Sequence, residues 1–540
     1  AEEYQQYIID RRDLLVPQNI REVKGSFFTP AIWVEKSQEY LEKAFGADWQ
    51  EEYYIWDCAA GTGNLLAGLQ NQYNLWASDI DQPNVDTMHA LIDGGLNLLH
   101  NHVFQFDFLN DILTLEEENA ENEKRAKLKL PLVERKLPQE LKKIIDDPEK
   151  RRKLIVYINP PYAEAATATA TRGTGKNKKN VSNLFSTHDQ YSEALGKSIR
   201  EVFIQFFIRI YFEIRGCKLA SFSKLKYINA PNFKNFRNYF KAEFLKGFII
   251  PANTFDNVKG KFPIGFLIWD TGIKKDIKKS AVDVYDEKGN FIAHKTFSSY
   301  DNFKTINRWL KNYVCEGAEL AAMCCKGTDF QNSNYVNINF NSQLKGIGDA
   351  KGITRFIITP KNLIPACVYY SVRHVVPATW LNDRDQFLYP DDAWEKDAEF
   401  QHNCLVYTLF NNNISCKYGV NHWIPFTEKA VAAKEKFESN FMSSFLKGKA
   451  FSEEAQEVLS AGKALWKYFH EKTKDSKTVS VNASFYDIRE FFQGRKESGA
   501  MNVKSADEDY TALLKALRDA LKALAKKIEP KVYAYGFLKE

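Results

Sequence analysis

Strand-like and helix-like segments alternate between residues 53 and 115, and this alternation constrains the fold more than any other feature of the chain. An apolar run over 53–57 leads into a glycine turn and a helix-like stretch. A second strand-like run covers 74–81, and a longer helix-like stretch separates it from a third, over 103–109. Such alternation predicts βαβ units, in which parallel strands form a sheet. We therefore expect an α/β fold with a Rossmann-like sheet and helices on both faces.

The rest of the chain predicts an insertion, a loop and a second domain. Residues 116–152 are almost wholly charged and polar, which indicates a surface insertion carrying helices. The apolar run 153–158 predicts the next buried strand. Residues 163–183 are basic and poor in apolar bulk, so we expect a mobile loop there. Because the rhythm changes near residue 285, we expect one domain over 1–285 and an α+β domain over 286–540.

Composition narrows the possible classes of protein. With 540 residues, 44% of them hydrophobic, the chain has material for more than one folded core. The net charge of +5 is small, so a polyanion would have to be held by local basic patches. No apolar run approaches the roughly 18 residues of a membrane span. The eight cysteines include no C-x-x-C pair, which predicts reduced core thiols and no metal site.

Small or acidic residues stand at the predicted carboxyl ends of three successive strands. A glycine turn follows the first strand and lets a ligand approach the backbone; its candidate binding residues are Asp57, Ala59, Gly61 and Gly63. Taken alone, this segment is equally explained as a tight turn that binds nothing. Asp79, followed by Ile80, ends the second strand, where a carboxylate can accept hydrogen bonds from two ribose hydroxyls. Asp107, followed by Phe108, ends the third.

These strand ends meet at the edge of an open α/β sheet where ligands bind, so together they predict a cofactor site. Leu66 occupies the position of the third glycine in the G-x-G-x-x-G motif, which argues against a dinucleotide with a pyrophosphate. S-adenosylmethionine, which has a ribose but no phosphate, fits the pattern better.

The sequence Asn159-Pro160-Pro161-Tyr162 directly follows the strand predicted over 153–158. Two prolines remove backbone donors and fix the chain, so carbonyls and one amide side chain are left as acceptors. The side-chain oxygen of Asn159 and the carbonyl of Pro160 can accept both hydrogens of an exocyclic amine. Tyr162 offers a ring face to a planar base, and Phe262 is the candidate for the opposite face. A chance turn at Asn159, and a core role for Phe262, are the alternatives.

Residues 221–241 contain five basic and six aromatic residues and no acid, a mixture suited to phosphates and bases. The same segment is equally consistent with a strand and an amphipathic helix that exposes a lysine face. The candidate contacts to nucleic acid are, in this segment, Lys224, Lys226, Lys234 and Arg237, and, in the basic loop, Lys176, Lys178 and Lys179.

In the order of these motifs, the chain resembles the gamma class of N6-adenine DNA methyltransferases, such as the Taq DNA adenine methyltransferase and the modification part of type IIG restriction enzymes. Residues 25–30, GSFFTP, are similar to the family's N-terminal cofactor motif. The similarity extends over residues 20–270, and Asn159 to Tyr162 match the catalytic motif at every position. The resemblance implies that Asp79 and Ile80 bind the ribose of S-adenosylmethionine and that Asp107 and Phe108 bind its adenine. The other cofactor contacts that it implies are Phe28, Thr29, Pro30, the turn from Asp57 to Gly63, Asn159 and Phe203.

The resemblance also implies how the chain is organised and what it acts on. Residues 1–285 would be a catalytic domain dependent on S-adenosylmethionine, and residues 286–540 a target recognition domain. Parts of residues 366–426 are similar to C-terminal segments of larger enzymes of the group. The expected substrate is adenine flipped out of double-stranded DNA, methylated by a protein that is a monomer on DNA in the bacterial cytoplasm, at the nucleoid. Tyr162 and Phe262 would stack on the base.

Other functions remain open. Protein glutamine methyltransferases related to HemK also use Asn-Pro-Pro-Tyr, although the Phe27–Pro30 motif and the long segment after residue 270 argue against them. An RNA methyltransferase acting on adenine N6 is a further alternative. A non-catalytic DNA-binding subunit is disfavoured by the intact motif. We expect no nuclease, because Pro390-Asp391 is followed by no [DE]-x-K triplet before Asp475.

Overall fold

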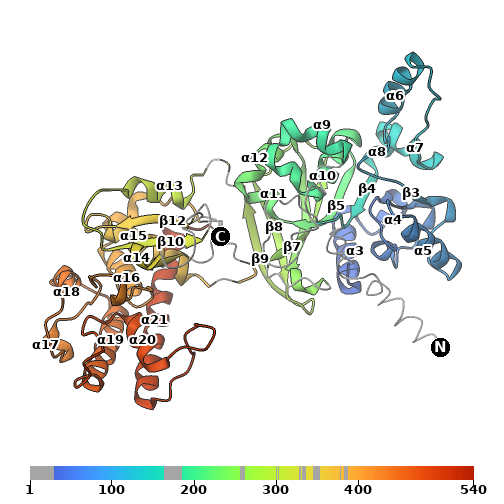
Figure 1. The fold of residues 1–540 in the computed structure, drawn as a ribbon. Helices are drawn as coiled ribbons and strands as arrows, with labels where there is room; N and C mark the ends of the chain where they lie inside the picture. Colours follow the sequence, from blue (N-terminus) through green and yellow to red (C-terminus); the bar gives the residue numbers. More distant parts are fainter. Residues whose placement is uncertain are drawn as a thin grey trace. The chain divides into compact units, whose positions relative to one another are not determined.

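Two compact units make up the chain (Figure 1). The computed structural model describes residues 29–162, 185–255, 262–299, 301, 303–326, 330, 336–344, 353–377, 379–381 and 387–539. One unit comprises Ala1–Asn302 with Thr379–Leu381, and the other comprises Phe303–Ala378 with Asn382–Glu540.

In the described part of the first unit, nine strands form one sheet in the order β3-β2-β1-β4-β5-β7-β6-β8-β9. The strands are β1 (Tyr54–Asp57), β2 (Leu75–Asp79), β3 (Val103–Gln105), β4 (Leu154–Ile158), β5 (Lys218–Lys224), β6 (Glu243–Pro251), β7 (Pro263–Asp270), β8 (Lys279–Tyr285) and β9 (Phe291–Ser298). Strands β1 to β5 pair in parallel, whereas β7 lies antiparallel between β5 and β6. The sheet is thus large and mostly parallel.

Helices cover both faces of this sheet, as the sequence predicts. All five residues of β4 are buried, and they alternate between two cores: Val156 and Ile158 pack in one, Ile155 and Tyr157 in the other. A strand buried on both faces has a continuous apolar sequence, which explains the run at 153–158. The mixed α/β class is therefore confirmed. The helices are α3 (Ala31–Phe45), α4 (Trp49–Glu52), α5 (Gln82–Asp93), α6 (Leu115–Lys127), α7 (Gln139–Asp146), α8 (Pro148–Arg152), α9 (Ser186–Leu195), α10 (Val202–Glu213), α11 (Lys226–Asn229) and α12 (Lys234–Tyr239).

The charged insertion at 116–152 contains helices, but it does not lie wholly on the surface. Helix α6 buries none of its residues and is stabilised at its start by a capping box between Thr114 and Glu117. Helix α7 instead buries Leu141, Ile144 and Ile145 in the core on one face of the sheet. Figure 1 shows α6 standing away from the sheet, next to α7.

Two local expectations differ from the structure. The glycine turn after β1 is followed by a single 3₁₀ turn, Asn64–Leu66, and not by an α-helix. The predicted boundary at 285/286 falls in the turn between β8 and β9, which both belong to the large sheet. The two units divide instead after Asn302, because β8 pairs with β6 and so continues the first unit.

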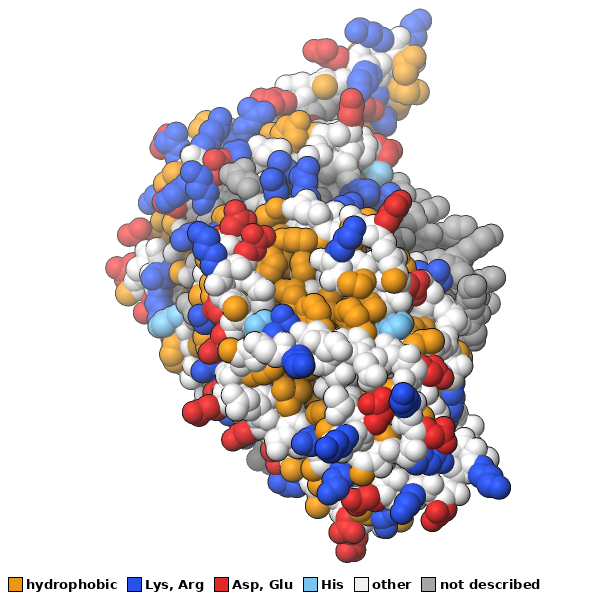
Figure 2. All heavy atoms as spheres, turned by 90° about the vertical axis from the view of Figure 1, so that its left-hand side faces the viewer, with side chains coloured by type: hydrophobic (Ala, Val, Ile, Leu, Met, Phe, Trp, Pro, Cys, Tyr) orange, Lys and Arg blue, Asp and Glu red, His pale blue; other side chains and the backbone are white. Residues whose placement is uncertain are grey.

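The described part of the second unit is mostly helical, with a small antiparallel sheet in the order β11-β10-β12. Its strands are β10 (Ala321–Lys326), β11 (Asn337–Asn339) and β12 (Ile353–Ile358). Its helices are α13 (Ile306–Leu310), α14 (Asn341–Leu344), α15 (Leu363–Val375), α16 (Ala398–Leu409), α17 (Glu428–Val431), α18 (Phe441–Leu446), α19 (Glu453–Lys472), α20 (Phe485–Gln493) and α21 (Glu508–Ala534). They enclose one hydrophobic core. On the face of the molecule in Figure 2, hydrophobic side chains gather near the centre and charges of both signs surround them.

Candidate functional site

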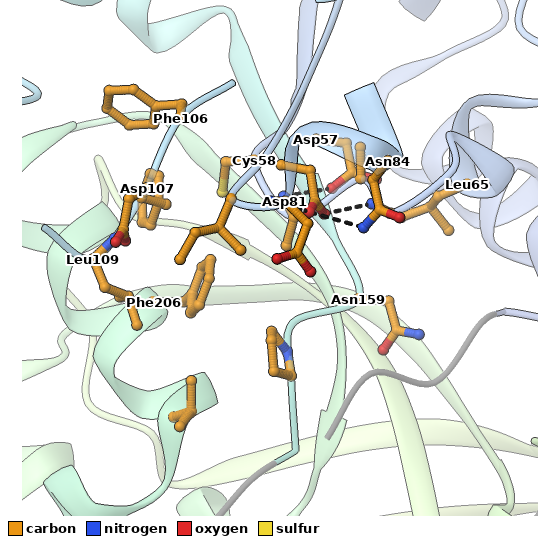
Figure 3. A pocket seen from close by; sticks show the side chains of 18 of the residues that line it. Asp57, Cys58, Leu65, Asp81, Asn84, Phe106, Asp107, Leu109, Asn159 and Phe206 are labelled. Carbon is orange, nitrogen blue, oxygen red and sulfur yellow. Dashed lines mark hydrogen bonds between the residues drawn. The ribbon is translucent and has the colours of Figure 1, made fainter. Parts of the chain in front are cut away.

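A cavity of about 260 Å³ opens at the carboxyl edge of the sheet, which we define as the edge where β1 to β5 end. Figure 3 shows side chains from the ends of β1, β2 and β4 pointing into it. It is lined by Thr29, Asp57, Cys58, Ala59, Ala60, Gly61, Asn64, Leu65, Asp79, Ile80, Asp81, Asn84, Phe106, Asp107, Phe108, Leu109, Asn159, Pro161, Phe185, Val202 and Phe206. The structure thus brings Asn159 together with most of the residues that the sequence predicts as contacts of a cofactor.

The glycine turn places the carboxylate of Asp57 at the base of the cavity. The side chain is 1% exposed, and its Oδ1 accepts a hydrogen bond of 3.1 Å from the backbone N–H of Ala59. Burial raises the pKa of Asp57 to about 8. Gly61 and Gly63 adopt φ of 56° and 82°, the left-handed region that favours glycine. The turn therefore holds a buried acid at the wall of the cavity.

Asp79 lies opposite this turn and is tied to it. Its Oδ2 accepts from the backbone N–H of Gly61 at 2.9 Å, while Oδ1 accepts from the backbone N–H of Asp81 and from Asn84 Nδ2, both at 2.9 Å. Burial is the largest influence on the pKa of Asp79 and raises it. A carboxylate has about four lone-pair sites, so these three bonds fix the group and leave Oδ2 able to accept from a ligand hydroxyl.

An aromatic wall lies at the end of β3. The rings of Phe108 and Phe206 are stacked, with centroids 5.1 Å apart and planes 11° apart, and both line the cavity. Asp107 at the entrance accepts from the backbone N–H of Leu109 at 3.1 Å and from Asn110 Nδ2 at 2.7 Å. The aromatic wall offers apolar contact to a planar ring, and Asp107 offers an acceptor beside it.

Phe203 does not line this cavity, contrary to the prediction from the family resemblance. Its side chain is fully buried in the core, where its ring meets the edge of Phe207 with centroids 5.5 Å apart. Phe206, three residues later on α10, occupies the cavity wall instead. Residues 202–210 of this helix are all buried, Gln205 and Arg209 included, so its apolar positions do not separate a cavity face from a core face.

The amide of Asn159 is held between two hydroxyls. Its Nδ2 donates to Thr29 Oγ1 at 3.0 Å, and its Oδ1 accepts from the hydroxyl of Tyr162 at 2.7 Å. Burial raises the pKa of Tyr162, so this hydroxyl stays protonated and remains a donor. These two bonds fix the orientation of the Asn159 amide at the end of β4. The contact with Thr29 joins the N-terminal motif to the end of β4, which the sequence did not indicate.

Lys224 supports the segment that follows Asn159 and does not present a free charge. Its Nζ forms an ion pair of 2.9 Å with the buried carboxylate of Glu201 and donates to the carbonyl of Tyr162 at 3.3 Å. The prediction that Lys224 contacts phosphates is therefore wrong for this conformation, because the ammonium already lies between two acceptors. The pair instead anchors the chain where it leaves the candidate site.

Arg237 is also wrong as a contact to nucleic acid. Only 2% of its side chain is exposed, and it forms a bidentate pair with Asp301 at 2.8 and 2.5 Å. Its remaining donors reach the carbonyls of Tyr227 at 2.8 Å and Ala230 at 2.9 Å. Lys226 and Lys234 are exposed, and their contact with nucleic acid stays a prediction.

Phe262 lies just before β7, whose first residues pair with the last residues of β5 and β6. Lys224 is opposite Ile264, so Phe262 belongs to the carboxyl edge, like Tyr162. Its side chain is 37% exposed and thus available to a ligand. The stacking role of Phe262 stays a prediction.

Several predicted residues have other positions. Pro30 is the N-cap of α3, Pro160 is buried, and Gly63 packs toward Met88, so none of the three lines the cavity. Phe28, Lys176, Lys178, Lys179 and the loop at 163–183 lie outside the described residues. Cavity residues that were not predicted from the sequence include Asn84, Phe106, Phe185 and Phe206. Asn84 could have been suspected from its position in the first turn of the helix after Asp79.

Neither metal sites nor membrane spans are found in the part of the chain that the structure describes. Within these residues, no group of three His, Cys, Asp or Glu side chains is arranged to hold a metal ion. No described helix has the length and apolarity needed to cross a membrane. The eight cysteines all lie in the described residues; none of them forms a disulfide there, and six are buried.

Comparisons with known proteins give only distant structural likeness. No protein-family model and no curated protein sequence matches the chain. A DrdV–DNA complex is 16% identical with a TM-score of 0.36, and the match covers 53% of this chain and 30% of that one. A nuclease-deletion mutant of the type ISP restriction-modification enzyme LlaGI, bound to a DNA substrate mimic, is 13% identical with a TM-score of 0.34, covering 61% and 36%.

The type IIG restriction endonuclease BpuSI is 12% identical with a TM-score of 0.33, and the match covers 94% of this chain and 66% of that one. The chain thus spans about a third of the length of DrdV and LlaGI. Because every one of these TM-scores is below 0.5, inferences about function rest on the site itself.

Proposed function

We propose that the chain is a site-specific DNA methyltransferase that transfers a methyl group from S-adenosylmethionine to N6 of an adenine flipped out of a duplex. One observation carries the proposal: Asn159, the first residue of Asn-Pro-Pro-Tyr, opens onto the same cavity as the carboxylates of Asp57 and Asp79. An acceptor for an amine and a set of groups suited to a ribose and a cation thus share one enclosed space.

The residues of the cavity fit S-adenosylmethionine. Oδ2 of Asp79 retains the capacity to accept from a ribose hydroxyl, and the stacked rings of Phe108 and Phe206 form a wall for an adenine. The buried acid Asp57 suits a ligand that carries a positive charge. The volume of about 260 Å³ is close to the lower limit of ligand pockets, which is roughly 300 Å³. When bound, the cofactor supplies an electrophilic methyl group.

The residues at the end of β4 orient the substrate amine. Oδ1 of Asn159 and the carbonyl of Pro160 accept its two hydrogens, which directs the nitrogen lone pair away from the ring. Thr29 fixes the amide of Asn159 in the required orientation by accepting from Nδ2. Tyr162 and Phe262 stack on the base and offset part of the few kcal/mol spent in extruding it. The proton leaves after transfer, so no strong base is required.

The choice of DNA as the methylated polymer rests on two observations. DNA is favoured by the resemblance to gamma-class enzymes and by a second unit, Phe303–Ala378 with Asn382–Glu540, large enough to recognise a target sequence. RNA and protein offer similar planar amino groups, so they are the alternatives to test.

The test is transfer of a tritiated methyl group to three substrates: duplex DNA, structured RNA and total protein. We expect label in DNA, recovered as N6-methyladenine after digestion, and none with the Asn159→Ala variant. Label in RNA or protein but not in DNA would overturn the choice of polymer. No label in any of the three, with folded protein and bound cofactor, would overturn the enzyme assignment.

Phe206→Ala is expected to weaken binding of S-adenosylmethionine by about tenfold, because a lost aromatic contact costs roughly 0.5 to 1.5 kcal/mol beyond the buried area. Phe203→Ala is the matched control on the same helix. It should lower stability by about 3 to 5 kcal/mol, since it empties a core position. Calorimetric titration and urea unfolding separate the two effects. Equal affinities for Phe206→Ala and the parent would show that the aromatic wall is not the adenine site.

Binding of S-adenosylmethionine should strengthen as the pH rises from about 6 to 9 and then become nearly constant. Burial holds the pKa of Asp57 at about 8 in the empty protein, so below that pH the carboxyl is mostly protonated and neutral. A ligand with a sulfonium charge binds the ionised form better, and must displace a proton when the pH is low. Titrations across this range with Asp57→Asn should lack the dependence. A parent affinity independent of pH would contradict this role.

A further inference from the structure

The amino edge of the large sheet, opposite the carboxyl edge, is bordered by four segments rich in Lys and Arg. The segments are residues 147–153, 214–218, 241–243 and 270–279, and we call them the basic edge. Together they contain eleven Lys or Arg and five Asp or Glu residues, a net charge of +6, while the whole chain carries +5. The remainder of the molecule is therefore almost neutral, and the net positive charge is concentrated here.

The segments border neighbouring strands. They precede β4, β5, β6 and β8, and residues 271–278 follow β7, so they adjoin the consecutive strands β4-β5-β7-β6-β8. Direct contacts join them: Arg151 Nε donates to the carbonyl of Arg215 at 2.8 Å, and the backbone N–H of Thr271 donates to the carbonyl of Cys217 at 3.1 Å. The basic edge is thus one continuous surface.

Carboxylates do not neutralise this surface. Four acids are paired, in Arg152–Glu149, Lys218–Asp270, Lys241–Asp276 and Lys275–Glu243. The fifth, Asp147, caps α8. Within the described residues, seven cations of the basic edge form no ion pair with a carboxylate: Lys150, Arg151, Lys153, Arg215, Lys274, Lys278 and Lys279. A hollow of about 720 Å³ is lined by Lys241, Lys274, Lys275, Asp276, Lys278 and Lys279, where an anion would meet several ammonium groups.

The basic edge cannot belong to the candidate active site. Asn159 and the cavity lie at the carboxyl ends of the parallel strands, whereas the basic edge lies at their amino ends. The strands between the two edges have five to nine residues from β4 to β6, a separation of roughly 16 to 30 Å at about 3.3 Å per residue. A duplex bound at Asn159 could reach the basic edge only if it were long or bent. Otherwise the basic edge would have to bind a second duplex.

The side chains of the basic edge indicate which polyanion it fits. Its segments contain no aromatic residue, so it offers no platform for the stacked bases of a single strand. Ile273, 47% exposed, is its one large exposed hydrophobic residue among those described, so it lacks the apolar centre of a protein interface. What it does offer is an array of flexible ammonium and guanidinium groups, which suits regularly spaced phosphates.

We propose that the basic edge binds the phosphodiester backbone of a nucleic acid duplex without reading its sequence, at a place separate from the candidate active site. Each phosphate contact releases counterions, so the interaction should be strong at low salt and should weaken steeply as salt is added. The proposal requires no methyl transfer and stands whether or not the chain is an enzyme.

The test compares two triple variants of the full chain with the same loss of charge. Lys274→Gln, Lys278→Gln and Lys279→Gln remove unpaired cations from the basic edge. Lys124→Gln, Lys127→Gln and Lys129→Gln remove exposed lysines from the charged insertion of the same unit. Fluorescence anisotropy with random-sequence duplex DNA, duplex RNA and polyglutamate, between about 50 and 200 mM salt, gives the affinities and the salt slopes.

For the triple variant of the basic edge, we expect the slope of log affinity against log salt for duplexes to fall by about 2 to 3, at roughly 0.9 per lost contact. The control variant should keep the slope of the parent. Comparison of the affinities for duplex DNA and duplex RNA shows which duplex the chain prefers. Equal slopes for both variants, or loss of polyglutamate binding with duplex binding intact, would overturn the proposal. If the parent chain shows the expected slopes but transfers no methyl group, the proposal for the basic edge is supported and only the proposed function is contradicted.

Discussion

Asn159→Ala should lower the rate of methyl transfer by about 100- to 1,000-fold, which corresponds to roughly 2.7 to 4 kcal/mol of lost transition-state stabilisation. The proposed reason is geometric: positive charge develops on the amine as the new bond forms, and the oxygen of Asn159 is the acceptor that we propose for this amine. Thr29 and Tyr162 fix this amide before substrate arrives, so its orientation costs nothing during the reaction. Single-turnover kinetics with enzyme in excess isolate the chemical step.

Tyr162→Phe is the matched control for this experiment. It removes the hydroxyl that donates to Asn159 but keeps the ring that would stack on the base. We expect a smaller loss, about tenfold, because the amide is still held by Thr29 and one net hydrogen bond is worth roughly 0.5 to 1.5 kcal/mol. Asn159→Ala retaining more than about a tenth of the parent rate would remove Asn159 from its proposed role.

Arg237→Met should destabilise the first unit by about 3 to 5 kcal/mol, the cost of removing one partner from a buried ion pair. Asp301 would lose its guanidinium, and the carbonyls of Tyr227 and Ala230 would lose their donors. Urea unfolding followed by tryptophan fluorescence measures the change. Lys234→Met, at an exposed position one turn earlier, is the control and should alter stability by no more than about 0.5 kcal/mol.

The same pair of variants distinguishes structural from binding roles in residues 221–241. If Lys234 contacts phosphate, Lys234→Met weakens duplex binding by a similar factor for all sequences and lowers the salt slope by about 0.9. Arg237→Met should not change that slope in molecules that remain folded. An Arg237→Met protein as stable as the parent would contradict the buried ion pair with Asp301.

The sequence alone determined where Asn159, Asp57 and Asp79 lie. Each follows an apolar run that is buried on both faces of the sheet, and parallel strands place their carboxyl ends at one edge. Two prolines end the segment locally, whatever packs around them. Because these features are set by period, strand direction and backbone restraint, they can be inferred without knowing any distant contact.

Only the tertiary structure decided which side chains are available to contact a ligand. Lys224 and Arg237 belong to a segment without acids, yet each meets a carboxylate from elsewhere, Glu201 and Asp301. The choice between Phe203 and Phe206 depends on how α10 is rotated against the sheet, and a helix that is buried on every side from residue 202 to 210 does not reveal it. The basic edge combines four segments that are far apart in sequence. The partners of ion pairs, the rotation of a helix and the assembly of a surface from distant segments are set by long-range packing. No local pattern in the chain encodes them.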